Sequence, residues 1–132
     1  MTDKYEITFD GGSLGNPGKG YGSFHITRNG EEFDRQIEVQ FGANMTNNQA
    51  EYLSLIGALK SIVNHPDADP NMIDITIRGD SQLVLKQLMG EWKVKHPNMQ
   101  PLWAEARGIL ADVHAWRAIW HARSNSVKLL GH

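Results

Sequence analysis

The hydrophobic period of this sequence changes from two residues to about 3.6 and back again, which limits the possible folds more than any other feature. Apolar and polar residues alternate over 5–9 and 33–41, a pattern that predicts strands. An Asn29-Gly30 pair between these runs favours a tight hairpin turn, because both residues tolerate positive φ. We therefore expect the first 45 residues to form an antiparallel meander of three strands, the first running to about Asp10.

Helical spacing replaces the alternation after Thr46. Thr46 and Gln49 have the form of a capping box, and apolar residues follow at intervals of three and four up to Val63. The rest of the chain indicates a strand over 73–77, a helix that starts at Ser81 and ends before Gly90, a helix over 100–114 and a last strand over 116–120. The order βββαβααβ, with a short tail, predicts an α/β fold. Its single five-stranded mixed sheet would be antiparallel in the meander and parallel where helices connect strands, with helices on both faces.

The composition is that of one soluble globular domain. The chain has 132 residues, of which 40% are hydrophobic and 21% charged, so we expect a single domain over residues 1–132 and a monomer. No apolar run is long enough to cross a membrane. The start at Met1 looks complete, and the residues that follow it do not resemble a signal peptide. We expect a cytoplasmic protein without a membrane partner. The absence of cysteine excludes disulfides and thiolate metal sites.

The charge is unevenly distributed. A net charge of −2 argues at first against a nucleic-acid partner, which usually selects a basic protein. However, residues 1–77 carry five Lys/Arg against eleven Asp/Glu, whereas residues 78–132 carry eight against four. A protein that binds phosphates through a cation-filled acidic site would have this asymmetry.

Three acids lie at or near the ends of predicted elements: Asp10 at the end of the first strand, Glu51 early in the first helix and Asp80 after the fourth strand. Each has a purely structural explanation, respectively a turn before Gly-Gly, a favourable interaction with the helix dipole and a local cap before Ser81. If strand four lies beside strand one, Asp10 and Asp80 meet at the carboxyl ends of strands, where open α/β sheets bind ligands. Converging carboxylates with no His or Cys among them favour Mg²⁺ or Mn²⁺.

The stretch after Asp10, GGSLGNPGKGYG, is rich in glycine. A loop with few side chains would allow a substrate backbone to approach Asp10 closely, while its own NH and C=O groups offer hydrogen bonds. The stretch has no GxxxxGK[ST] pattern and precedes a strand instead of a helix, so a mononucleotide-binding loop is not indicated.

Three segments, DGGSLGNPGKGYG, TNNQAEYLSLIGAL and GDSQLVLKQLMGEWKVK, resemble in order and spacing those of type 1 ribonuclease H, which cuts the RNA strand of RNA/DNA hybrids. The resemblance covers residues 5 to about 103. It implies the ribonuclease H-like fold and two Mg²⁺ or Mn²⁺ ions held by Asp10, Glu51 and Asp80.

The resemblance also implies contacts with the substrate. Amide side chains suit RNA, since a 2′-hydroxyl both donates and accepts hydrogen bonds. Helix capping remains an equal and compatible explanation for Thr46, and ordinary solvation explains the two lysines as well. The positions carried over as substrate-binding are Gly11, Gly12, Ser13, Asn16, Thr46, Asn47, Asn48, Trp92, Lys93 and Lys95.

The tail departs from the family pattern, which usually has a fourth acid near the C-terminus. No Asp or Glu follows Asp112. Among the oxygen ligands of the tail we select Asn125 as the fourth catalytic and metal-binding residue, with helix capping as its alternative role. An uncharged ligand would weaken binding of the second metal ion, which predicts a preference for Mn²⁺. The mobile histidine of the family has no clear counterpart, and neither His121 nor His132 is assigned a role.

The sequence therefore predicts an endonuclease that hydrolyses the RNA strand of hybrids by two-metal-ion catalysis, leaving 5′-phosphate and 3′-hydroxyl ends as the resemblance implies. The alternative is a hybrid-binding module that lost turnover with its fourth acid. Three intact but mutually repelling carboxylates argue against that alternative.

Overall fold

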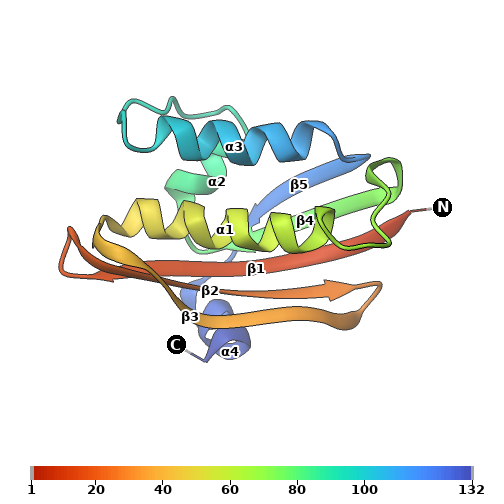
Figure 1. Cartoon of the computed structure of the whole chain (residues 1–132), viewed down its shortest axis with the longest axis horizontal. Helices are drawn as coiled ribbons and strands as arrows, with labels where there is room; N and C mark the ends of the chain where they lie inside the picture. Colours follow the sequence, from red (N-terminus) through yellow and green to blue (C-terminus); the bar gives the residue numbers. More distant parts are fainter. Residues whose placement is uncertain (1, 132) are drawn as a thin grey trace.

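Five strands form one mixed sheet in the order β3-β2-β1-β4-β5 in the computed structural model, which describes residues 2–131 (Figure 1). The first three strands are antiparallel, whereas β4 pairs in parallel with both β1 and β5. The strands are β1 (Asp3–Leu14), β2 (Gly18–Arg28), β3 (Glu31–Met45), β4 (Ile73–Gly79) and β5 (Ala115–Trp120). The expected meander and parallel pairs are confirmed.

Helices cover both faces of the sheet, as predicted. Figure 1 shows α1 (Asn47–Val63), α2 (Gln82–Leu88) and α3 (Gln100–Ala111) on one side and α4 (Arg123–Leu130) on the other. A short 3₁₀ turn, Pro70–Met72, leads into β4. Among the described residues, no helix combines the length and apolar character needed to span a bilayer.

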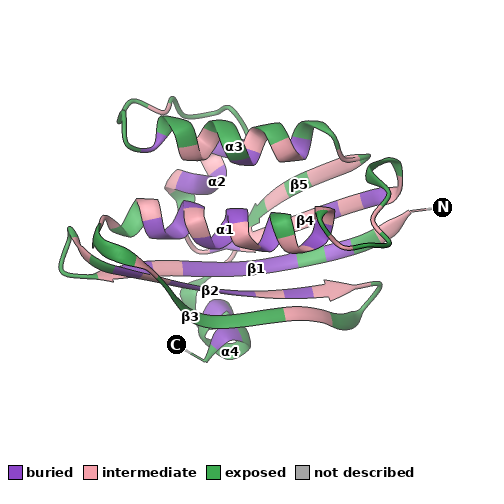
Figure 2. Cartoon of the chain, in the orientation of Figure 1, coloured by how far each residue is buried: buried purple, intermediate pink, exposed green. Residues whose placement is uncertain are grey.

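The main core lies between α1 and the middle of the sheet. Alternate residues of β1 and β4 point toward α1, and Ile7, Phe9, Ile75 and Ile77 are fully buried there. Figure 2 shows buried residues along the middle of β1 and at intervals along α1. The predicted capping box holds the start of α1: the Thr46 side chain accepts from the Gln49 backbone while the Gln49 side chain accepts from the Thr46 backbone.

The first strand is longer than predicted, because it continues past Asp10 to Leu14. Gly11 and Gly12 pair with β2 as part of a long hairpin, so only its tip is a turn. A Cβ at Gly11 would lie 2.5 Å from the carbonyl group of Ala50, and one at Gly12 would lie 2.8 Å from the Tyr21 hydroxyl. These glycines therefore permit close packing of β1, a structural reason that the loop hypothesis did not include.

The third strand is an irregular edge strand. Its register against β2 shifts at several points, and Glu38 has a positive φ of 52°. Ile37 and Val39 consequently remain 41% and 37% exposed, although alternation predicts one dry face. Bulges of this kind are common at sheet edges, where they discourage pairing with another chain.

The predicted short tail is wrong, since residues 123–130 form α4. Ser126 and Leu130 are buried beneath it, and Gly131, in the left-handed region with a φ of 79°, ends the helix. Five of the eight residues of this helix are polar or charged and only two are buried, so its apolar face is too short to produce a clear periodic signal.

Candidate metal site and nucleic-acid groove

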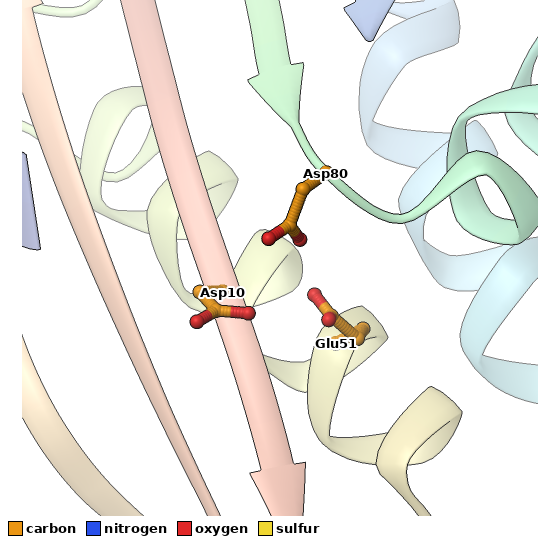
Figure 3. Close-up of side chains that lie close together, drawn as sticks. All are labelled: Asp10, Glu51 and Asp80. Atoms are coloured by element: carbon orange, nitrogen blue, oxygen red, sulfur yellow. The ribbon is translucent and has the colours of Figure 1, made fainter. Parts of the chain in front are cut away.

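Three carboxylates converge beside the end of β4. Asp10 lies on β1, Glu51 on α1 and Asp80 directly after β4, and one ligand oxygen from each lies within 4.8 Å of the others. Figure 3 shows the three side chains pointing into a common space. The predicted juxtaposition of the three acids is thus present in the structure.

The sheet register places two of these acids together. The parallel pairing of β1 with β4 ends at Thr8 and Arg78, and each acid follows two residues later on its own segment. Two contacts fix the backbone at the end of β4: the amide of His121, directly after β5, donates to the Gly79 carbonyl at 2.9 Å, and the Trp120 indole donates to the Asp80 carbonyl at 3.1 Å. Asp80 is therefore held by its backbone, leaving the carboxylate to face Asp10.

Glu51 is a buried residue in the second turn of α1. The first turn of this helix contains no acid, so the predicted helix-dipole explanation for Glu51 does not hold. Glu51 is 8% exposed and Asp10 is 3% exposed. Burial raises the pKa of Glu51 well above its ordinary value, and the neighbouring Asp10 and Asp80 raise it further. The site therefore disfavours three simultaneous negative charges.

The donor set fits a divalent cation. Glu51 Oε2 and Asp80 Oδ2 are buried and make no hydrogen bond. A buried carboxylate oxygen without a partner is costly unless a cation satisfies it. Three carboxylates are hard oxygen ligands of the kind that Mg²⁺ and Mn²⁺ prefer. These residues are thus able to hold one or more such ions.

A network of amide side chains joins the β1–β2 turn to the start of α1. The Asn47 side-chain oxygen accepts from the backbone and the hydroxyl of Ser13 at 2.9 and 3.0 Å. The Asn16 side-chain oxygen accepts from the Asn47 backbone at 3.2 Å. Asn16, Asn47 and Asn48 are all exposed. Three predicted substrate-binding amides therefore lie together on one surface, at the start of the helix that carries Glu51.

This surface continues into a groove of about 420 Å³ between the start of α1 and the segment after α2. The groove brings Thr46 and Asn48 together with Lys93 and Lys95, which come from distant parts of the sequence. Trp92, 45% exposed, lines two neighbouring hollows that also include Lys93. The predicted contacts for a nucleic acid thus form a connected surface.

The segment that carries these basic residues is anchored to the core through Gln87. The Gln87 side chain accepts from the buried Tyr52 hydroxyl at 2.6 Å and donates to the Lys93 carbonyl at 3.4 Å. Its backbone carbonyl also accepts from the Trp103 indole at 3.0 Å. A buried amide therefore links the position of the groove wall to α1, the helix that holds Glu51.

Residues 9–128 match a family described as reverse transcriptase-like. The crystal structure of ribonuclease H1 from Halobacterium salinarum superposes with a TM-score of 0.83 and 32% identity, covering 97% of this chain and 92% of the other. The chain belongs to the type 1 ribonuclease H family.

Other members of this family are also similar. The N-terminal ribonuclease H domain of Rv2228c from Mycobacterium tuberculosis has a TM-score of 0.84 and 28% identity, covering 97% of this chain and 96% of the other. LC11 ribonuclease H1, solved in complex with an RNA/DNA hybrid, has a TM-score of 0.82 and 27% identity, covering 95% of this chain and 90% of the other.

The curated relatives are longer than this chain. The ribonuclease HI of Halobacterium salinarum is 39% identical over 111 residues, which cover 82% of this chain and 51% of that protein. The bifunctional protein Rv2228c is 33% identical over 124 residues, which cover 93% of this chain and 32% of that protein. This ribonuclease H chain thus spans about half the length of the first relative and about a third of the length of the second.

The tail of this ribonuclease H chain places a cation, not an acid, nearest the carboxylates. Arg123 Nη1 lies 3.6 Å from Asp80 Oδ2. Asn125 lies on the exposed side of α4, and its role as a fourth ligand stays a prediction. Its alternative capping role is wrong, because the N-cap of α4 is Ala122 and no side chain caps this helix end. Analysis of the sequence missed Arg123, although it is the first cation after β5 and lies in the segment that lacks the expected acid.

His121, just after β5, connects this strand to α4. His121 Nε2 forms a 2.8 Å hydrogen bond with the hydroxyl of the buried Ser126, which ties the end of β5 to α4. Burial lowers the pKa of His121, while Asp80 opposes this effect. His121 therefore stabilises the position of α4. His132 lies outside the described residues.

Proposed function

We propose that this chain is a metal-dependent endonuclease that hydrolyses the RNA strand of RNA/DNA hybrids. The observation that carries the proposal is the convergence of Asp10, Glu51 and Asp80 with two buried oxygens that make no hydrogen bond, beside a groove lined by amides and lysines. Membership of the ribonuclease H family and the solved hybrid complex of LC11 ribonuclease H1 support the choice of substrate.

In the proposed reaction the chain's own residues supply charge and position. Two divalent ions bound by the three carboxylates would activate the attacking water and stabilise the departing 3′-oxygen, giving 5′-phosphate and 3′-hydroxyl ends. Asp10 and Glu51 fix this centre from the rigid core, where burial excludes bulk water. Asn125 is proposed as an uncharged fourth ligand, which favours Mn²⁺ over Mg²⁺.

The groove supplies the preference for a hybrid. In this proposal Asn16 donates to and accepts from 2′-hydroxyl groups of the RNA strand, and Asn47 and Asn48 face the minor groove. Thr46, Lys93 and Lys95, which line the same groove, are proposed to contact the DNA strand. Gly11 to Ser13 approach the RNA strand in the same proposal. We further propose that the active form is one domain, monomeric and cytoplasmic.

The test is cleavage of a 5′-labelled RNA strand, presented alone, in an RNA/RNA duplex and in an RNA/DNA hybrid. Each substrate is incubated with Mg²⁺, Mn²⁺ or EDTA, beside an Asp10→Asn variant as the control for contaminating nuclease. The proposal expects cutting only of the hybrid, only with metal, faster with Mn²⁺, and absent in the variant. Cutting of all three substrates, or persistent cutting by the variant, contradicts it.

A second candidate is a hybrid-binding module without turnover. The absence of Asp and Glu after Asp112 favours it, because the family usually contributes a fourth acid from the tail. This candidate predicts that the wild-type chain binds the hybrid but never cuts it in either metal. The same gel and a parallel binding assay with the labelled hybrid separate the two functions.

A further inference from the structure

Arg123 occupies an unusual position at the edge of the carboxylate site. Its guanidinium is 3.6 Å from Asp80 Oδ2, an oxygen that is buried and otherwise without a hydrogen bond. The two side chains differ in their surroundings, since 68% of the Arg123 side chain is exposed but only 10% of that of Asp80. The cation therefore reaches the site from solvent and is free to leave it.

The local sequence gives Arg123 no structural reason to be there. It is the first residue of α4, whose N-terminus has no side-chain cap and whose first turn has no acid. A cation at a helix N-terminus is unfavourable, because the helix dipole places partial positive charge there. The compensating interaction is with Asp80, so the position of Arg123 is explained by the carboxylate site.

A second contact surface lies on the outer side of Arg123. The residue lines a hollow of about 290 Å³ together with Leu14, Tyr21, Glu38 and Gln40, on the face of the sheet that carries α4. A guanidinium leaving Asp80 would have room at this hollow. Glu38 lines the same hollow and would repel a phosphate inside it, so an anionic ligand of Arg123 would have to lie outside this hollow.

We propose that Arg123 is a positioning residue that neutralises Asp80 before metal binds and is displaced by the metal to contact a phosphate of the RNA strand. The first half concerns this chain alone, whereas the second half rests on the proposed nuclease function. Arg123 is thereby the tail residue that sets the net charge of the site, in the place of the fourth acid that the family usually has. It keeps the empty site from accumulating negative charge and then supplies positive charge to the substrate.

Calorimetric titration of Mn²⁺ into the substrate-free protein tests the first half. Arg123→Ala should bind Mn²⁺ about two- to fivefold more tightly than wild type, as expected from removing one partly exposed ion pair. Arg123→Lys should stay near wild type because it retains the competing charge. Lys128→Ala, which removes an exposed cation from the same helix, is the matched control and should also stay near wild type. Equal affinities for wild type and Arg123→Ala overturn the competition.

Steady-state cleavage of the hybrid tests the second half. Arg123→Ala should raise KM more than it lowers kcat, and the slope of log(kcat/KM) against log salt should become shallower by about one phosphate contact. An unchanged KM and salt slope, as expected if Glu38 captures the displaced guanidinium, overturns the phosphate contact. If wild type cleaves no hybrid, the proposed function has failed, while the calorimetric result still decides the ion pair.

Discussion

The two sides of the carboxylate site are built in opposite ways. On one side, β1 and α1 present Asp10 and Glu51 from the most deeply buried part of the molecule, and the backbones of the two elements are in close contact at Gly11 and Ala50. On the other side, α4 presents Arg123 from a short helix with only two buried residues. The core fixes the positions of Asp10 and Glu51, whereas the exposed side chain of Arg123 is able to move.

The difference shows which part of the chemistry depends on the fold. Carboxylates that must stay close together despite their repulsion need rigid support, because a flexible site would relax by separating them. A cation that only balances charge needs no such support. Changes to the rigid side should therefore affect both stability and activity, whereas changes to the tail should alter metal and substrate affinity with little effect on folding.

The largest expected effect on the rigid side comes from Gly11→Ala. Its Cβ would lie 2.5 Å from the Ala50 carbonyl and 2.6 Å from the Glu51 backbone nitrogen, so backbone atoms must move. We expect a loss of about 3 kcal/mol in the free energy of unfolding, measured by urea denaturation. Gly108→Ala is the matched control, since a Cβ there meets nothing within 4 Å, and it should not destabilise. Equal stability of the two variants would show that β1 and α1 are less tightly joined than the structure indicates.

The second effect is the pH dependence of the metal-free protein. Burial and two neighbouring acids raise the pKa of Glu51 above its ordinary value of 4.5. As the pH rises past 4.5, the unfolded chain releases this proton while the folded protein retains it, so stability falls with rising pH up to the folded pKa. The loss amounts to about 1.4 kcal/mol for each unit by which the pKa is raised.

Glu51→Gln removes this titration while preserving the size of the side chain. In EDTA, thermal melts from pH 4 to 8, a range set by the ordinary glutamate pKa, should show a weaker decline for the variant than for wild type. Added Mn²⁺ should stabilise wild type more than the variant, because the ion replaces the retained proton. A parallel decline in both proteins would mean that Glu51 is not the group responsible.

The sequence predicted the rigid side well because its signals are local. Thr46 and Gln49 are three residues apart, and their capping box depends only on that spacing. The order of strands and helices favoured parallel pairs where helices connect strands, and the meeting of Asp10 with Asp80 was predicted on the condition that β4 lies beside β1, which the structure shows. Most of the fold and the three acids were therefore within reach of periodicity, caps and connection rules.

The parts that escaped prediction depend on contacts between distant segments. The extension of β1 to Leu14 requires Gly11 and Gly12 to fit against α1 and Tyr21, which glycine content alone does not reveal. The position of Arg123 depends on α4 folding back beneath the sheet. Helix propensity and hydrophobic period carry little information about either contact.

A smaller effect is expected in the groove, between the two sides. Lys93 is exposed and lines the wall of the groove, so Lys93→Ala should weaken hybrid binding and reduce the salt slope of the affinity by about one. Fluorescence anisotropy with a labelled hybrid in EDTA measures both without cleavage. Lys4→Ala, an exposed lysine near the start of β1, is the matched control. Equal losses in both variants would indicate general electrostatic attraction and no defined groove contact.

The smallest effect is expected at Asn125, and it separates metal ligation from an effect on the helix dipole. Asn125→Asp should raise activity in Mg²⁺ by a few-fold if the side chain reaches the metal, because a carboxylate adds the missing charge, and Asn125→Ala should lower it. An acid in the first turn of α4 also stabilises the helix dipole, so Ser124→Asp, an exposed neighbour in the same turn, serves as the control. Ligation predicts a gain for Asn125→Asp alone, measured as initial cleavage rate at limiting Mg²⁺. Equal gains from both aspartates would assign the effect to the helix, leaving Arg123 as the tail residue that acts on the carboxylates.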